Sequence, residues 1–427
     1  MPFSSLGLRP ELLKALKPKD YPAPTPIQTL AIPAVLQGVD VQASAQTGSG
    51  KTAAYALPVL ELLLRQPRQW PRDTPRAVHS LVLVPTRELA VQVGETLRSL
   101  AVQLPTNLKI TVVFGGVSIN PQMMGLRGGA DVVVATPGRL LDLLSKNAVN
   151  LSQVQVLVLD EADKLLDLGF QDELQAILQN LPAQRQNLLF SATFAPAVQS
   201  LADALLTDPV RIDVLTLAGT APDIVQRAIS VEAPQRTQLL KHLFQTHGWK
   251  RVLVFAATQH ACQIIAAKLR KAGINAEPFH GQLSQGKRSQ VLADFKASRV
   301  KVVIATDVAS RGLDISELPV VVNFDLPRSA VDYTHRIGRT GRAGHSGLAV
   351  SFVGPETEAH WRLIEKRQSI SVPREVLPGF EPQTPETAVA DAPHPTGTAN
   401  DPTGGIKGKR PNKKDKLRQA QRLLSPE

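Results

Sequence analysis

The sequence predicts an α/β protein of two tandem domains, each a mostly parallel sheet flanked by helices, followed by a disordered basic tail. The chain has 427 residues, which is enough for two domains with additional segments. Short apolar runs alternate with helical patterns, pause near Asp208 and resume after Pro222. Strands that are apolar on both faces and alternate with helices are typical of a parallel sheet covered on both sides.

The expected elements follow from apolar runs that end in polar or turn-like segments. In the first half, strands are expected at Ser80–Val84, Ile110–Phe114, Asp131–Ala135, Val154–Leu159 and Asn187–Phe190, with helices at Thr86–Leu100 and Phe170–Leu181. In the second half, strands are expected at Arg251–Phe255, Val300–Ile304, Val320–Phe324 and Leu348–Phe352.

Composition sets the expected boundaries of the domains. An N-terminal region at 1–29 precedes a first domain at 30–211, a linker at 212–222 and a second domain at 223–370. Beyond about Ser371, repeated prolines break regular elements and the last residues are basic. Residues 371–427 are therefore expected to be mostly disordered, with Pro378–Phe380 a candidate for docking back on the second domain.

Charge and cysteine content narrow the class of function. The net charge is +11 and the pI about 9.8, which favours polyanionic partners. From Gly404 onward, eight Lys and Arg residues face two acidic ones, so this tail either binds RNA nonspecifically or only keeps the chain soluble. No apolar run is long enough to span a membrane, no secretory signal begins the chain, and the single Cys262 is expected to be a buried hydrophobe, as in a cytoplasmic protein.

A glycine-rich segment has the pattern of a phosphate-binding loop. Its residues are Ala45, Gln46, Thr47, Gly48, Ser49, Gly50, Lys51 and Thr52. Glycines allow the backbone to curve tightly around phosphates, and the following helix N-terminus attracts the anion. Lys51 is expected to reach the β- and γ-phosphates of a nucleotide, and Thr52 to ligate Mg²⁺.

An acidic pair follows the buried run Val156–Leu159, where α/β sheets bind ligands. Asp160 suits Mg²⁺, which prefers hard oxygen ligands, and the next residue, Glu161, is placed to polarise the attacking water. In the second half, Tyr333–Arg342 is rich in Arg and Gly. Arg339 and Arg342 lie three residues apart, so both can project from one side of a helical turn as arginine fingers toward a γ-phosphoryl group.

At this point the chain resembles the DEAD-box ATP-dependent RNA helicases, whose two domains are RecA-like. The motifs that carry the resemblance are Pro24–Gln28, Pro85–Ala90, Thr136–Arg139, Asp160–Asp163 and Ser191–Thr193. Such motifs run from Phe3 to about Gly344, and Phe114–Met124 is similar to the bacterial RhlE-type subgroup. The resemblance makes residues 1–29 a Q-motif region, although Asp20 stands where the family usually has glycine.

The resemblance implies roles for individual residues. Gln28 would read the adenine edge with Phe3 stacking nearby, and Gly312 and Asp314 would lie near the ribose. The residues expected to contact RNA, through charge, backbone N–H groups or close approach, are Pro85, Thr86, Arg87, Gly115, Gly116, Thr136, Gly138, Arg139, Gly281, Thr306 and Asp307. Those expected to couple the ATP and RNA sites are Ser191, Thr193, Gln285, Arg288, His335 and Arg336.

The expected function is RNA-stimulated ATP hydrolysis, with ATP and Mg²⁺ as cofactors, coupled to local, non-processive unwinding of short RNA duplexes or remodelling of RNA–protein complexes. Aromatic residues make up only 4% of the chain, so contacts to the sugar-phosphate backbone, with little sequence specificity, are expected. Two alternatives remain at this stage: an ATP-gated RNA clamp without net unwinding, and a DNA-directed motor on the same fold. Ribosome-assembly and RNA-decay partners are both open, and a monomer is the default.

Overall fold

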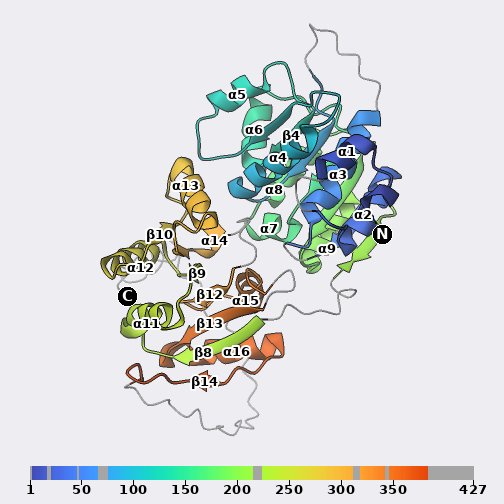
Figure 1. Cartoon of the computed structure of the whole chain (residues 1–427). Helices are drawn as coiled ribbons and strands as arrows, with labels where there is room; N and C mark the ends of the chain where they lie inside the picture. Colours follow the sequence, from blue (N-terminus) through green and yellow to red (C-terminus); the bar gives the residue numbers. More distant parts are fainter. Residues whose placement is uncertain are drawn as a thin grey trace, which may run out of the picture. The chain divides into compact units, whose positions relative to one another are not determined.

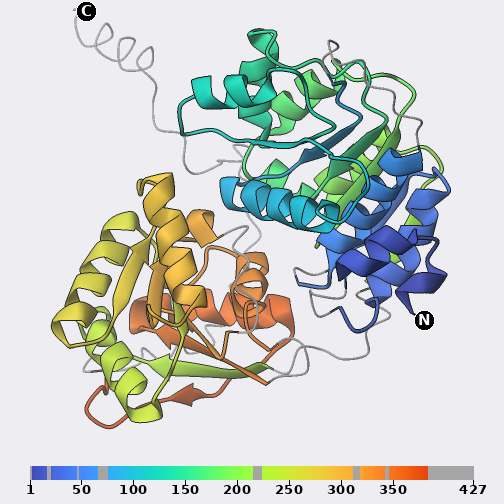
Figure 2. The ribbon, with the colours of Figure 1, turned by 45° about the horizontal axis from the view of Figure 1, so that its top comes forward.

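The computed structural model describes residues 2–16, 21–45, 48–65, 76–214, 224–310, 318–341 and 346–382. Within them, the strands form two seven-stranded sheets, and every paired strand is parallel to its neighbour. Helices cover both faces of each sheet (Figures 1 and 2). The expected fold class, two tandem RecA-like α/β domains, is confirmed.

The first sheet has the strand order β3-β4-β2-β5-β6-β1-β7. Its strands are β1 (Val41–Ser44), β2 (Ser80–Leu83), β3 (Ile110–Val113), β4 (Val132–Ala135), β5 (Val156–Leu159), β6 (Gln186–Ser191) and β7 (Val210–Asp213). Because all of these strands are parallel, their carboxyl ends meet along one edge of the sheet.

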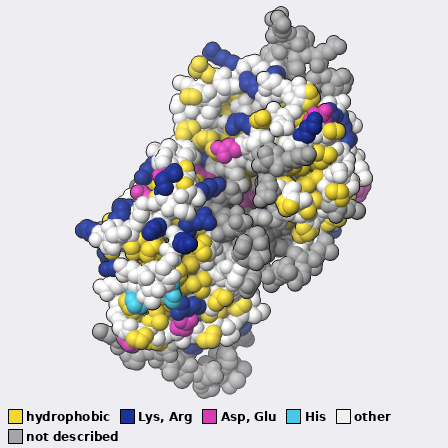
Figure 3. All heavy atoms as spheres, viewed as in Figure 1, with side chains coloured by type: hydrophobic (Ala, Val, Ile, Leu, Met, Phe, Trp, Pro, Cys, Tyr) yellow, Lys and Arg dark blue, Asp and Glu magenta, His cyan; other side chains and the backbone are white. Residues whose placement is uncertain are grey.

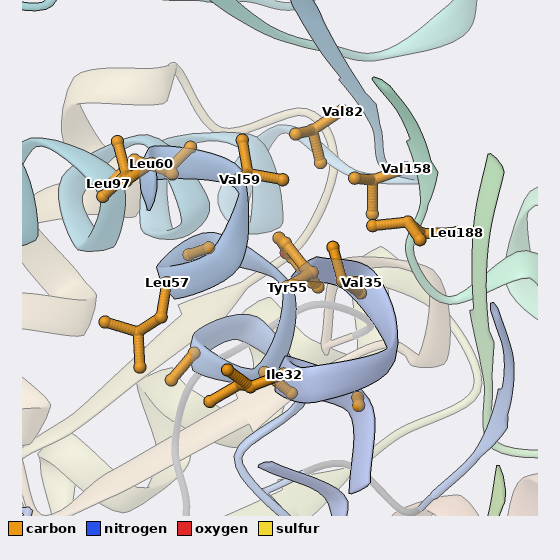
Figure 4. Close-up of a cluster of buried hydrophobic side chains, with 14 of the residues drawn as sticks. Ile32, Val35, Tyr55, Leu57, Val59, Leu60, Val82, Leu97, Val158 and Leu188 are labelled. Carbon is orange, nitrogen blue, oxygen red and sulfur yellow. The ribbon is translucent and has the colours of Figure 1, made fainter. Parts of the chain in front are cut away.

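The helices of the first half pack on two faces of this sheet. They are η1 (Phe3–Ser5), α1 (Pro10–Leu16), α2 (Pro26–Leu36), α3 (Lys51–Arg65), α4 (Arg87–Ala101), α5 (Asn120–Leu126), α6 (Pro137–Ser145), α7 (Ala162–Asp167), α8 (Gln171–Leu178) and α9 (Pro196–Leu205). Successive residues of β2 serve different faces: Val82 joins the core under α2, α3 and α4 (Figure 4), whereas Leu81 and Leu83 join the core under α6 to α9.

The second sheet has the order β10-β11-β9-β12-β13-β8-β14. Its strands are β8 (Ile224–Ser230), β9 (Val252–Phe255), β10 (Ala276–Phe279), β11 (Val302–Ala305), β12 (Val320–Asn323), β13 (Gly347–Val353) and β14 (Arg374–Glu375). Its helices are η3 (Ala233–Gln235), α11 (Arg236–His247), α12 (Gln259–Lys271), α13 (Gln285–Lys296), α14 (Asp307–Ser310), α15 (Ala330–Ile337), η4 (Pro355–Thr357) and α16 (Glu358–Gln368).

All nine expected strands are present, but β1, β7, β8, β10 and β14 were not expected from the sequence. Of these, β7, β10 and β14 lie at sheet edges, where one side of the strand is unpaired and a weaker apolar pattern suffices. β10 also contains Pro278, which is confined in sheets to edges or strand starts.

The expected end of the second domain at 370 is corrected by the structure. β14 pairs with β8, and Arg374 donates to the carboxylates of Glu358 and Glu365 at 2.9–3.1 Å. Phe380 packs on the second core with its ring 5.5 Å from that of His242, so the docking of Pro378–Phe380 is confirmed. The second domain therefore continues to about residue 382, and the basic tail beyond it lies outside the described residues, as does most of the expected linker.

Two further expectations concern the single cysteine and membrane-spanning helices. Cys262 is buried in α12, and burial raises the pKa of its thiol to about 12, as expected of a small hydrophobe rather than a nucleophile. In the described part of the chain, none of the helices combines the length and apolar character needed to cross a bilayer.

Candidate nucleotide site and nucleic-acid interface

The order of the first sheet divides its carboxyl edge into two adjoining regions. The neighbouring strands β5, β6 and β1 lead into the acidic pair, Ser191–Thr193 and the phosphate loop. The neighbouring strands β3, β4 and β2 lead into the residues expected to contact RNA. Parallel α/β sheets bind ligands outside this edge, so one edge carries both expected sites side by side.

The phosphate loop connects β1 to the start of α3 at Lys51. Gly48 and Gly50 have φ of 85° and 92°, in the left-handed region that favours glycine. The Lys51 ammonium is buried and has no hydrogen-bond partner among the described residues, while Gln46 and Thr47 lie outside them. A buried cation without a partner, beside tightly curved backbone, is suited to a polyphosphate.

Gln28 ties the N-terminal region to this loop. Its side-chain carbonyl accepts from Thr25 N at 3.0 Å, and its Nε2 donates to Gly50 O at 3.1 Å. A Cβ on Gly50 would clash with the Gln28 amide, so the close approach requires glycine. Phe3 is buried and packs edge-on against Tyr21, with ring centroids 6.1 Å apart. The expected adenine contacts of Gln28 and Phe3 stay predictions.

The acidic pair lies directly after β5. Asp160 is 2% exposed; its Oδ1 accepts from Glu161 N at 2.9 Å and its Oδ2 accepts from the Tyr55 hydroxyl at 2.8 Å. Burial raises the pKa of Asp160 to about 6, and the nearby charge of Lys51 limits the rise.

Glu161 adopts a backbone conformation that is unfavourable for its residue type. Its φ is 52° and its ψ is 52°, in the left-handed region, where it serves as the N-cap of α7. Its Oε2 is buried without a partner among the described residues. Such strain persists only where the surroundings enforce it, and here it leaves a free carboxylate oxygen at the ligand-binding edge of the sheet.

The oxygen atoms at this edge fit Mg²⁺. The Tyr55 hydroxyl donates to Asp160 Oδ2 and also interacts with the Thr52 side chain, so one hydroxyl adjoins both expected ligands. The described residues contain no cluster of three or more His, Cys, Asp or Glu that could hold a metal by themselves. A site with one carboxylate and one hydroxyl suits Mg²⁺, which takes its remaining oxygens from phosphates and water.

Ser191 connects the acidic segment to the end of β6. Its Oγ accepts from Asp163 N at 3.2 Å and donates to Thr193 O at 2.7 Å. The structure thus joins the expected coupling residues Ser191 and Thr193 to the same turn that carries Glu161.

The expected RNA-contacting residues of the first half come together at the ends of β2, β3 and β4. Gly115 N donates to Thr136 Oγ1 at 3.3 Å. Gly116 has a φ of 76°, and a Cβ there would overlap the Arg87 guanidinium. Arg139 is largely buried and donates to Val117 O at 2.7 Å, so it supports the glycine turn.

The remaining first-half residues flank this cluster. Pro85 and Thr86 follow β2, and the Thr86 side chain caps α4 by accepting from Leu89 N at 3.3 Å. Gly138 lies in the first turn of α6, and a Cβ there would meet open space. Backbone N–H groups at a helix N-terminus are suited to phosphate.

In the second half, Gly281 and Thr306 follow the neighbouring strands β10 and β11. Asp307, which begins α14, accepts a two-point hydrogen bond from Arg336 at 2.6 and 2.7 Å. The same guanidinium donates to Asn323 Oδ1 and lies 4.8 Å from the Phe255 ring centroid. Arg336 therefore joins the carboxyl ends of β9, β11 and β12.

Of the other site residues expected in the second half, the structure describes some and leaves three outside the described residues. Gln285 begins α13, Arg288 lies 5.0 Å from the Phe279 ring centroid, and His335 lies in the last turn of α15. Arg339 lies two residues beyond the end of α15 at Ile337. Outside the described residues lie Gly312, Asp314 and Arg342.

Two supporting residues were missed from the sequence. Tyr55 reads as one more apolar position of a helix, and only the structure reveals the partner of its hydroxyl. Gln122 pairs with both backbone groups of Phe114: its Oε1 accepts from the N–H at 2.9 Å and its Nε2 donates to the carbonyl at 3.1 Å. This amide extends the end of β3 and fixes the turn that carries Gly115 and Gly116.

Comparisons with known proteins identify the family. Residues 25–201 match the DEAD/DEAH box helicase family, and residues 235–344 match the helicase conserved C-terminal domain. The DEAD-box ATP-dependent RNA helicase CshA of Bacillus cereus is 39% identical over 365 residues, covering 85% of this chain and 67% of that protein. The ATP-dependent rRNA helicase RRP3 of Pyricularia oryzae is 41% identical over 389 residues, covering 91% and 70%.

Solved structures agree with this assignment. S. cerevisiae Dbp5 bound to RNA and ADP BeF3 is similar with a TM-score of 0.77 and 32% identity, over 88% of this chain and 95% of that chain. Mss116p bound to single-stranded RNA and AMP-PNP is similar with a TM-score of 0.76 and 28% identity, over 88% and 78%. With the phosphate loop, the acidic pair and the glycine turn on one sheet edge, the chain belongs to the DEAD-box ATP-dependent RNA helicases.

Proposed function

We propose that this chain hydrolyses ATP in the presence of Mg²⁺ when RNA is bound, and uses the cycle for local, non-processive unwinding of short duplexes or remodelling of RNA–protein complexes. The observation that carries the proposal is the shared sheet edge. The Lys51 ammonium and a Glu161 carboxylate oxygen, neither with a hydrogen-bond partner in the part of the chain that the structure describes, follow β1 and β5, and the Gly115–Gly116 turn follows β3 in the same sheet.

The catalytic roles follow from the positions of these side chains. Lys51 would bind the β- and γ-phosphates, and Thr52 and Asp160 would hold Mg²⁺. The chemistry that Mg²⁺ supplies when bound is neutralisation of charge on the phosphate oxygens. Glu161 accepts the proton of the attacking water as the oxygen–γ-phosphorus bond forms and ADP leaves.

The second domain supplies arginines to this reaction. Arg339 and Arg342 stabilise the negative charge that spreads over the γ-phosphoryl oxygens. Because phosphate loop and fingers belong to different domains, hydrolysis requires the domains to close around ATP. RNA held by residues of both domains favours the same closed state, so ATP and RNA bind cooperatively.

The RNA contacts are to the sugar-phosphate chain. Glycine turns, a helix N-terminus and Arg87 offer charge and backbone N–H groups, which carry little sequence information. Basic side chains are more prominent than acidic ones on the face shown in Figure 3, in keeping with attraction of a polyanion. A preference for RNA over DNA requires 2′-hydroxyl contacts and rests on the family.

Finer assignments extend the proposal. Membership of the RhlE-type subgroup rests on the similarity of the segment Phe114–Met124 to that subgroup. Partners in ribosome assembly or RNA decay, a monomeric state and a cytoplasmic location stay predictions from the sequence.

The test is steady-state ATP hydrolysis with no nucleic acid, with single-stranded RNA, or with single-stranded DNA of equal length. The variants are wild type, Glu161→Gln, and Glu95→Gln as a matched control, because Glu95 is exposed on α4. Stimulation by RNA alone, lost only in Glu161→Gln, is expected. Equal stimulation by DNA would favour the DNA motor, and stimulation without displacement of a fluorescent duplex strand would favour the RNA clamp.

A further inference from the structure

A buried tyrosine links the two side chains expected to hold Mg²⁺. Tyr55 lies one turn into α3, three residues after Thr52, so the two side chains share a helix face. Its hydroxyl donates to Asp160 Oδ2 at 2.8 Å, across 105 residues of sequence. Burial raises the pKa of the tyrosine, and its interaction with the Thr52 side chain, three residues earlier on the same helix, lowers that pKa in part.

We propose that Tyr55 is a positioning residue for the metal site: its hydroxyl holds the Asp160 carboxylate and the Thr52 hydroxyl in the orientation in which both serve one Mg²⁺. This inference rests on the proposed function, because it assumes a Mg²⁺–nucleotide ligand. No contact between Tyr55 and the nucleotide or the reacting atoms is required.

The tyrosine ring is held rigidly enough for this role. Tyr55 has no exposed surface, and its ring lies 5.3 Å from that of Phe190 on β6, tilted by 56°. Figure 4 shows it in the core between α2, α3 and the sheet, near Val35 and Val158. A close-packed ring cannot shift without disturbing its neighbours, so the hydroxyl is a fixed point.

The carboxylate depends on this fixed point. Among the described residues, Asp160 accepts one hydrogen bond on each oxygen, from Glu161 N on Oδ1 and from the Tyr55 hydroxyl on Oδ2. Two donors on different oxygens fix the plane of the carboxylate, whereas one donor leaves rotation about the side-chain bonds. Each carboxylate oxygen keeps lone-pair capacity for a metal-bound water.

The test uses Tyr55→Phe in the full chain, which removes the hydroxyl and retains the ring. Binding of a fluorescent ADP analogue is measured while Mg²⁺ is titrated, and again in excess EDTA. The Mg²⁺ concentration that gives half of the metal-dependent gain in affinity is expected to rise roughly tenfold, the scale of one hydrogen bond to a charged group. Binding in EDTA is expected to stay within twofold.

Tyr333→Phe is the matched control. Tyr333 is also buried, donates to Gln226 Oε1 at 2.7 Å and packs against Trp361, but it belongs to the second sheet's core. The Tyr333→Phe variant also loses a buried, hydrogen-bonded tyrosine hydroxyl, but one in the other sheet. Its Mg²⁺ titration is therefore expected to match that of the wild type. Thermal unfolding of both variants reports how much stability each hydroxyl contributes.

A double-mutant comparison isolates the interaction between Tyr55 and Asp160. In an Asp160→Asn background, adding Tyr55→Phe is expected to shift the Mg²⁺ titration less than it does in the wild type, because the carboxylate is already gone and only the positioning of Thr52 can still be lost. High Mg²⁺ is expected to restore kcat of Tyr55→Phe, which a general loss of folding would not allow.

Two results would overturn the inference: a Mg²⁺ midpoint within twofold of the wild type in folded Tyr55→Phe, or an equal loss of nucleotide affinity in EDTA, which would mean that Tyr55 supports the phosphate loop instead. Failure of the proposed function is distinguishable, because it would appear in the wild type itself as nucleotide binding that does not respond to Mg²⁺.

Discussion

Asp160→Asn is expected to stabilise the protein when metal and nucleotide are absent, although it should abolish hydrolysis. Burial raises the pKa of this carboxyl from 3.8 to about 6, so its ionised form is costly in the folded state. Asparagine has nearly the same shape and carries no charge. The Tyr55 hydroxyl, which donates to Asp160, can instead accept from an asparagine amide by rotating its hydrogen.

The sign and size follow from proton linkage. Between pH 3.8 and about 6, the folded protein binds this proton more tightly than the unfolded chain, so the stability of the wild type falls as pH rises through that window. A shift of about two pKa units corresponds to about 3 kcal/mol, reached above pH 6. The advantage of Asp160→Asn should therefore be near zero at pH 4 and approach that value at pH 8.

The assay is hydrogen exchange of first-sheet peptides in EDTA at several pH values, since unfolding of a two-domain chain need not be two-state. Asp131→Asn is the control of opposite sign. Asp131 is equally buried but accepts from Arg76 at 2.6 Å and from Lys109 N at 2.7 Å, so its loss should destabilise. An Asp160→Asn protein that is no more stable than the wild type at pH 8, or whose advantage does not change with pH, would refute the reasoning.

Further expectations concern other parts of the molecule. Gly116→Ala introduces a Cβ at positive φ against the Arg87 guanidinium, and should raise the RNA concentration for half-maximal ATPase by about tenfold, the scale of 1–2 kcal/mol of backbone strain and displaced contact. Arg336→Lys loses a two-point carboxylate contact and should destabilise the second domain by about 3 kcal/mol in urea unfolding. A chain ending at Pro382 should keep the melting temperature of the second domain but need more RNA and show a flatter salt dependence, whereas a chain ending at Ile370 should also melt earlier, because it lacks β14.

Most of the interior strands and the phosphate loop were predictable from sequence because each carries its own local signal, although the interior strands β1 and β8 were not expected. Val156–Leu159 is a continuous buried run, and glycines beside Lys51 report a tight turn before a helix. The edge strands were not predictable: β14 has only two residues, and β10 contains a proline. Their pairing depends on neighbours distant in the chain, which a local pattern does not encode.

What the sequence could not predict at the site is mostly which polar side chains and backbone groups contact one another. Arg139 was expected to contact RNA and Arg336 to couple the two ligands, and both roles stay predictions. The structure adds that Arg139 supports Val117 and that Arg336 joins three strand ends. Arginine serves equally well as a ligand contact and as a buried brace, and only its partners in space distinguish the two uses.

Three energetically unfavourable features of the fold coincide at the candidate site, and they identify it without reference to any sequence motif. Five non-glycine residues of the described chain have positive φ, and four of them, Asn147, Asp208, Ser298 and Ser369, are exposed, where turns tolerate that conformation. Only Glu161 combines this strain with burial, and it adjoins a carboxylate whose pKa is raised by burial. Lys51, whose charge acts on Asp160, is buried without a partner among the described residues. A strained residue, a carboxylate that is costly to ionise and a buried ammonium without a hydrogen-bond partner among the described residues lie at one sheet edge. A ligand that brings phosphates, metal and water would relieve each of these costs, so their coincidence points to the kind of ligand that this edge binds.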